Sequence, residues 1–352
     1  MQLVAMGAQD VFLTGNPQIT FFKVVYRRHT NFSKECIKQD FSGSGSNVTC
    51  TLSRNGDLVQ EIYLHGNAKA GYEADVTSKV IKTVEVEIGG QKIDKHYGAW
   101  LDIYNELFET NHDYQAAMCH GVSGTATPEV FIPLRFWFNR NPGLALPLIA
   151  LQYHEVKILV EMNESTSLTD ADLLVNYVYL DTDERRRFAQ VSHEYLIEQV
   201  QHTGVESVGA SGSSVTLTYN HPVKALFWRG FATNISYTAK LQLNGHDRFT
   251  AQSERYFHLV QPYECGLGHS KTMGQTDNKW APNVGGSHTS AMYSFCLKPG
   301  EHQPSGSCNF SRIDNARLVI GGSPGATDLS IFALNYNVLR VMSGMGGLTY
   351  SN

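Results

Sequence analysis

Hydrophobic and polar residues alternate one by one in short runs along most of the chain. Clear examples are residues 80–88, 215–219 and 239–243. A period of two is typical of a strand that buries one face, and long stretches of helical periodicity are nearly absent. Gly-Gly at 89–90 and Asn-Gly at 244–245 follow two of these runs, and such dipeptides favour tight hairpin turns. The pattern predicts an all-β protein.

One segment, residues 98–109, departs from this alternation. Its apolar side chains recur at the spacing of one helical face, at Trp100, Ile103, Tyr104, Leu107 and Phe108. This spacing predicts a short amphipathic helix. In an otherwise all-β chain we expect the helix to close one end of a sheet sandwich, and not to bind a membrane or a cofactor.

The two halves of the chain resemble each other weakly at a separation of about 155 to 160 residues, as in an internal repeat. Residues 84–94 form a strand, a glycine turn and a polar return, and residues 239–249 have the same form, with Gly90 aligned to Gly245. Two further pairs of segments correspond in the same order: 132–138 with 293–297, and 153–158 with 313–318. The repeat predicts two copies of one β-sandwich, each of about 155 residues and long enough for the eight strands of a jelly roll.

A charged cluster at residues 181–187 lies between two strand-like segments, and we expect it to be a solvated connector. Asp181 and Asp183 within it are not expected to bind a metal, because no other type of ligand clusters nearby. The predicted organisation is an N-terminal arm over residues 1–25, a first jelly roll over 26–181, a linker over 182–190 and a second jelly roll over 191–352.

Composition points to a protein that associates with other subunits. Charged residues make up only 17% of the chain, against about 25% in an average soluble protein. So little charge suggests that much of the surface is covered by other subunits. The net charge of −5 leaves no global positive field to neutralise phosphates, so direct nucleic-acid binding is not expected.

The N-terminus lacks the basic start and apolar core of a secretory signal, and no apolar run approaches the roughly 20 residues of a membrane span. We therefore expect synthesis in the cytosol. The six cysteines contain no CxxC pair and are too sparse for a disulfide scaffold, so they are predicted to be reduced thiols.

Several motifs of known metal and cofactor sites are missing from the sequence. No two of the 14 histidines are separated by two or four residues, as an HxH pair or an HExxH zinc site requires. A GxGxxG loop is also missing. We predict no catalytic residues, no cofactor and no metal, and hence a binding or building role in place of an enzyme.

Several long stretches in both halves carry a resemblance to a known family. In the first half these are residues 10–32, which begin Asp-Val-Phe-Leu-Thr-Gly-Asn-Pro, and residues 132–154, which begin Ile-Pro-Leu-Arg-Phe-Trp-Phe. In the second half they are residues 243–249, 293–299, 303–314 and 331–340. These segments resemble the major capsid proteins of nucleo-cytoplasmic large DNA viruses, of the phycodnavirus and mimivirus-like kind.

The resemblance implies two tandem eight-stranded jelly rolls and a homotrimer. Six similar sandwiches would give the trimer a pseudo-hexagonal outline and let it tile an icosahedral shell. The implied partners are further copies of the chain, minor capsid proteins, a penton protein and the inner viral membrane, the last reached through the N-terminal arm. The implied location is the outer shell of the virion, assembled in the host cytoplasm.

Two groups of residues are predicted to take part in assembly. The first is the basic and aromatic cluster of the arm, which fits contact with acidic partners or lipid headgroups as well as a merely solvated strand edge: Lys23, Tyr26, Arg27, Arg28 and His29. The second belongs to a Pro-kinked segment expected to close a sandwich end and shape subunit contacts: Arg135, Phe136, Trp137, Asn141 and Pro142. The main alternative function is a tandem jelly-roll carbohydrate-binding protein, and a metal-independent hydrolase is a more distant one.

Overall fold

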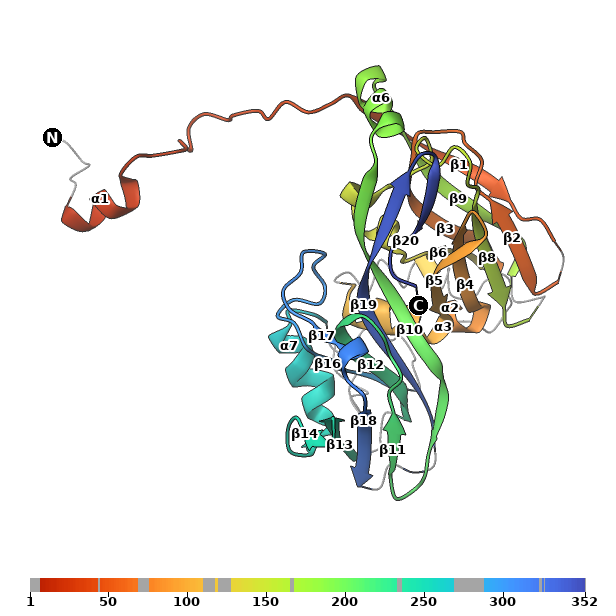
Figure 1. Ribbon diagram of the computed structural model, residues 1–352, viewed down its shortest axis with the longest axis vertical. Helices are drawn as coiled ribbons and strands as arrows, with labels where there is room; N and C mark the ends of the chain where they lie inside the picture. The colour runs from red at the N-terminus through yellow and green to blue at the C-terminus, as the bar shows by residue number, and fades with distance from the viewer. Residues whose placement is uncertain are drawn as a thin grey trace. The chain divides into compact units, whose positions relative to one another are not determined.

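The computed structural model describes residues 7–43, 45–68, 76–109, 118–119, 128–164, 168–232, 236–268, 288–322, 325 and 327–351. The chain divides into two units, Met1–Asn31 and Phe32–Asn352. In the first unit a short helix, α1 (Ala8–Thr14), is followed by extended chain (Figure 1). All described residues of this arm are exposed, including its phenylalanines, valines and Tyr26.

The first β-sandwich of the second unit contains two antiparallel sheets. One sheet has the order β1 (Phe32–Asp40), β9 (Leu168–Leu180), β3 (Leu58–Ala68) and β6 (Glu129–Pro133), with β7 (Leu146–Pro147) also paired to β3. The other has the order β2 (Asn47–Thr51), β8 (Val156–Met162), β4 (Ile81–Ile88) and β5 (Gln91–Tyr97).

The second β-sandwich repeats this order in the rest of the chain. Its first sheet is β10 (His193–Val208), β19 (Thr327–Met342), β12 (Pro222–Ala232) and β16 (His288–Ser294), with β17 (Cys308–Asn309) on β12 and β20 (Met345–Leu348) on β19. Its other sheet is β11 (Ser213–Thr216), β18 (Ala316–Gly322), β13 (Tyr237–Leu243) and β14 (His246–Asp247), with β15 (Gln252–Ser253) also on β13. The predicted all-β class and the internal repeat are both confirmed.

Short helices connect the strands. They are α2 (Val76–Val80), α3 (Gly98–Leu107), α5 (Trp137–Arg140), the 3-10 turns η1 (Pro142–Leu144) and η3 (Phe310–Arg312), α6 (Thr182–Gln190), the π-helical turn η2 (Tyr256–Val260) and α7 (Gln261–Glu264). The charged cluster forms α6, which has no buried residues and joins the two sandwiches in sequence. The Asp181 side chain caps α6 by accepting a hydrogen bond from the backbone N–H of Thr182.

Strand pairing gives a residue-by-residue correspondence between the sandwiches. A register shift directly follows Val59 in β3, and one directly follows Val223 in β12. Counting four residues on from each gives Tyr63 and Phe227, which therefore occupy matching positions. Such irregularities set the direction of the side chains that follow, so their shared position indicates that the match is structural and not only topological.

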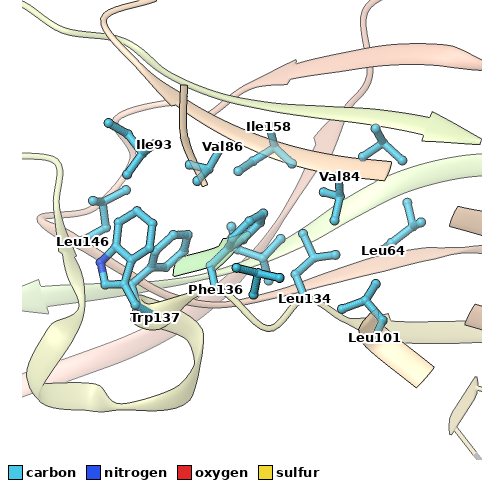
Figure 2. Packing of buried hydrophobic residues seen from close by; sticks show 14 of the residues in the cluster. Leu64, Val84, Val86, Ile93, Leu101, Leu134, Phe136, Trp137, Leu146 and Ile158 are labelled. Atoms are coloured by element: carbon cyan, nitrogen blue, oxygen red, sulfur yellow. The ribbon is translucent and has the colours of Figure 1, made fainter. Parts of the chain in front are cut away.

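Alternating residues of the strands build two main cores. The largest lies within the first sandwich, where Val84, Val86 and Ile158 from one sheet pack over Phe136 and Trp137 (Figure 2). A second core fills the second sandwich. The first core continues into the β10–β19–β12–β16 sheet of the second sandwich, where its members include Ala225, Phe227, Met292, Phe332 and Leu334. The two sandwiches therefore share one continuous buried region.

Candidate functional site

Helix α3 is one of the elements that contact both sandwiches. Its first residue, Gly98, lies so close to β4 that an added Cβ would be 2.2 Å from the Ile81 carbonyl oxygen, so glycine is required there. The Trp100 ring, 1% exposed, lies 5.3 Å from the Phe227 ring and 5.8 Å from the Phe332 ring, measured between centroids. The predicted helix is confirmed, but its expected role is corrected: it covers the second sandwich as well as belonging to the first.

A buried carboxylate, Glu198 of β10, binds two cations from different sandwiches. Its Oε2 lies 2.8 Å from Nη1 of Arg140, which belongs to α5 of the first sandwich. Its Oε1 accepts a hydrogen bond of 2.6 Å from Nζ of Lys224 in β12. Lys224 is fully buried, donates a second hydrogen bond to the backbone carbonyl of Glu301 and lies over the Tyr336 ring.

The charges of this cluster depend on each other. Burial lowers the pKa of Lys224, and its attraction to Glu198 opposes that effect. Burial also disfavours the charge on Arg140, but Glu198 and Tyr104 outweigh it and raise the pKa of the guanidinium. Because one carboxylate compensates two buried cations, its loss leaves both without their counter-charge.

A second ion pair joins α3 to the other sandwich. Nη1 of Arg229 in β12 lies 3.1 Å from Oε2 of Glu106, and its Nη2 lies 4.0 Å from Oδ2 of Asp102. Asp102 and Glu106 are four residues apart and so lie on one face of the helix. The same Nη1 donates to Ser290 Oγ at 3.2 Å.

Hydrogen bonds between side chains and backbone groups also join β5 to β10 across the contact. Asp94 Oδ1 accepts a hydrogen bond from the Val200 backbone N–H at 3.1 Å, and the Gln199 side-chain amide donates to the Ile93 carbonyl. Asn337 of β19 in turn donates to Gln199 Oε1 at 2.8 Å. These bonds satisfy polar groups that would otherwise be buried without a partner.

The C-terminal hairpin of β19 and β20 contacts the first sandwich at residues 151–154. The backbone N–H of Tyr153 donates to the Gly344 carbonyl at 3.0 Å, and His154 Nδ1 lies 3.0 Å from the Gly346 carbonyl oxygen. A Cβ added at Gly346 would lie 2.6 Å from Leu151 Cδ2, so this approach also depends on glycine. The chain end therefore ties the second sandwich to the first.

The first group of predicted assembly residues belongs to the N-terminal unit. Lys23, Tyr26, Arg27, Arg28 and His29 are all exposed in the first unit. They follow the apolar residues Phe21 and Phe22, which are 90% and 98% exposed. Basic and aromatic side chains are therefore exposed next to each other in this unit.

The second predicted group divides between the core and the surface. Phe136 and Trp137 are fully buried inside the first sandwich, so these side chains hold the protomer together and cannot themselves form a subunit contact. Arg135 pairs with Glu109 at 2.9 Å. Asn141 accepts a hydrogen bond from the Gly143 N–H at the start of η1, and Pro142 is exposed beside it.

The described part of the chain holds no group of three or more His, Cys, Asp or Glu side chains arranged to bind a metal ion. Among the helices of that same part, none combines the length and apolar character needed to cross a bilayer. All six cysteines carry free thiols.

The residues that join the sandwiches were not singled out from the sequence. A partial signal exists at Lys224 and Arg229, the two charges in the otherwise apolar run Pro222–Ala232, because charges in such a run need partners when they are buried. Glu198 and Arg140 carry a weaker signal, because Gln199 follows Glu198 and Asn139 and Asn141 flank Arg140. Their pairing follows only from the way in which the two sandwiches pack.

Comparison with known proteins decides the family. A model described as "Major capsid protein N-terminus" matches residues 20–181, and one described as "Large eukaryotic DNA virus major capsid protein" matches residues 184–236 and 229–347. The major capsid protein of Pyramimonas orientalis virus is 53% identical over 397 residues, which covers 100% of this chain and 99% of the relative.

The chain belongs to the major capsid protein family of large eukaryotic DNA viruses.

Further comparisons agree with this family. The major capsid protein of Paramecium bursaria Chlorella virus 1 is 40% identical over 449 residues, covering 100% of the chain and 99% of the relative. A quasi-atomic model of the PBCV-1 virus capsid matches with a TM-score of 0.77 and 35% identity, over 95% of this chain and 100% of that one. The Faustovirus major capsid protein shares the fold, with a TM-score of 0.73 and 12% identity over 96% and 94% of the chains.

The predicted double jelly-roll fold is thereby confirmed for this major capsid protein. Its role is that of a structural capsid component, which decides against the lectin-like alternative. The buried contact between its sandwiches fixes how the two jelly rolls of one chain are oriented toward each other.

Proposed function

We propose that the protein forms homotrimers with six jelly rolls each, and that these pseudo-hexagonal capsomers tile an icosahedral shell. The observation that carries this proposal is the continuous buried contact between two sandwiches of the same strand order. A rigid pair of similar units needs only three copies to complete a six-lobed ring. A shell subunit has no need of an active site, so we also propose that the protein is not an enzyme.

The domains of this capsomer subunit are proposed to be the arm over residues 1–25, the jelly rolls over 26–181 and 191–352, and the linker over 182–190. The strands of the first sandwich all lie within Phe32–Leu180, and those of the second within His193–Leu348, which supports these boundaries. The exposed chain that precedes Phe32 supports a separate N-terminal arm.

The arm is proposed to face the inside of the shell. Its exposed aromatic and basic residues support contact with minor capsid proteins or with an inner viral membrane. Binding to a membrane surface is favoured by apolar side chains that insert among the lipids together with cations that attract the headgroups. Contacts with neighbouring capsomers and a penton protein, and assembly in the host cytoplasm, belong to the same proposal. Direct contact with nucleic acid does not, in view of the net charge of −5.

Native mass spectrometry with electron microscopy of the purified protein tests the proposal. We expect a mass of three chains and threefold particles with a hexagonal outline. A monomer without such particles at micromolar concentration would contradict it.

A further inference from the structure

The helix that follows the fifth strand occurs in both sandwiches but has different surroundings. In the first sandwich β5 pairs with β4 up to Tyr97, and α3 begins at the next residue. In the second, β15 pairs with β13 up to Ser253, and helical chain begins at residue 254 and continues through η2 and α7. Residues 98–107 and 254–263 are therefore counterparts.

The face of α3 that covers the second sandwich has an apolar counterpart that is left uncovered. Counting from the helix starts, Trp100 corresponds to Tyr256 and Tyr104 to Val260. Trp100 is 1% exposed, whereas its counterpart Tyr256 is half-buried; Tyr104 is half-buried, whereas its counterpart Val260 is 41% exposed. One turn beyond Val260, Tyr263 is 85% exposed.

A second pair of counterparts shows the same difference. In the first sandwich, Leu134 lies opposite Ile62 of β3. In the second, Tyr293 lies opposite Leu226 of β12, and Leu226 is the counterpart of Ile62. Counting on four residues gives Phe138, which is fully buried, and Leu297, which is 76% exposed.

The surface that would cover these residues also has a counterpart. Trp100 packs on Phe227 and Phe332, which face each other across β12 and β19. The matching pair in the first sandwich is Tyr63 and Leu174, which face each other across β3 and β9. Both side chains are only partly buried.

We propose that Val260, Tyr263 and Leu297 form a docking surface for the first sandwich of a second copy of this chain, where Tyr63 and Leu174 receive them. The proposal rests on the trimer proposed above and names the contact that closes it. Contacts between sandwiches within a chain and between chains then alternate around the ring and use matching residues. Large aromatic and aliphatic side chains at such a position are typical of the centre of an interface.

Replacing Val260 and Tyr263 together, as Val260→Glu with Tyr263→Glu, tests the docking surface. Both side chains are exposed in the protomer, so circular dichroism and the melting profile should match those of a folded subunit. We expect the trimer to be at least about 30-fold weaker in sedimentation analysis, as for the loss of an interface anchor. The matched control is Val205→Glu, since Val205 is 61% exposed elsewhere on the second sandwich. It should leave the trimer intact.

Cross-linking provides a second readout that does not depend on disrupting the fold. Tyr63→Cys and Tyr263→Cys are combined in a chain that also carries Cys36→Ser, because Cys36 is exposed. Treatment with a short bis-maleimide should give a covalently closed trimer on a denaturing gel, and either single cysteine variant should not.

The outcomes separate this inference from the proposed trimer. If the wild-type protein is a trimer and both the glutamate variant and the cross-linking behave like the controls, the docking surface is wrong and the trimer stands. If the wild-type protein is a monomer, the proposed function fails and the docking surface fails with it. A glutamate variant that misfolds leaves the decision to the cross-linked trimer, whose presence supports the surface and whose absence overturns it.

Discussion

The two sandwiches have the same strand order but differ in what covers their matching faces. In the first, α3 is buried against its neighbour through Trp100, and an ion pair joins Glu106 to Arg229. In the second, the counterpart helix leaves Val260 and Tyr263 exposed. This difference in coverage supports the proposed assembly, in which another copy of the chain covers the second face.

Truncation of Trp100 should have the largest effect. Trp100→Ala removes a fully buried ring from the contact between the sandwiches and should lower the free energy of unfolding by about 3 to 5 kcal/mol. The counterpart change, Tyr256→Ala, removes a half-buried ring and should cost the isolated protomer less than about 2 kcal/mol. Urea denaturation at matched protein concentration measures both, and equal losses would contradict the difference in coverage.

Loss of the shared carboxylate should have the next largest effect. Glu198→Gln leaves Arg140 and Lys224 buried without a counter-charge and should lower the free energy of unfolding by about 3 kcal/mol. The matched control is Lys34→Gln. Lys34 of β1 is exposed and occupies the position in the first sandwich that Glu198 occupies in the second. Lys34 pairs with Val178, and Glu198 pairs with Tyr336, the counterpart of Val178. Its replacement should change stability by less than about 0.5 kcal/mol.

Replacement of the whole cluster sharpens this test. Arg140→Met, Glu198→Leu and Lys224→Met together remove every charge and leave apolar groups of similar size, so stability should return close to that of the wild type. If Glu198→Gln were as stable as the wild type, the two cations would not depend on the carboxylate, and the account of this contact would be wrong.

The smallest effect concerns His65, which occupies the position of Arg229 in the first sandwich. Burial lowers its pKa, but hydrogen bonds to Glu129 and Asp172 outweigh burial and raise it above the usual value. Because the folded state holds the proton more tightly, this stabilisation is present at acidic pH and is lost as pH rises through the raised pKa. His65→Gln should therefore cost about 1 kcal/mol near pH 5.5 and less near pH 8.5.

Melting curves of the wild type and His65→Gln across this range measure the difference. Lys38 also pairs with Asp172, at 2.6 Å, and stays charged throughout, so Lys38→Met provides a control whose effect should vary little with pH. A loss at His65 that grows toward alkaline pH would contradict the assigned proton.

Most of the fold follows from the sequence because period-two alternation and glycine turns are local signals. The runs at residues 80–88 and 239–243 predict β4 and β13, and the repeat between them predicts the shared topology. The contact between the sandwiches is different. Nothing local to Glu198 distinguishes it from a solvated strand residue, because its partners are brought to it from distant parts of the chain by packing. For the same reason the burial of Phe136 and Trp137 could not be separated from surface exposure beforehand.

A cryo-EM map of the purified oligomer tests the central claim most directly, since it shows both the ring and the contacts within it. The account predicts six jelly rolls around a threefold axis, with η2 and α7 of each chain lying against the β3–β9 face of the next. A map with a single chain, or a ring in which Tyr263 faces solvent, would contradict it.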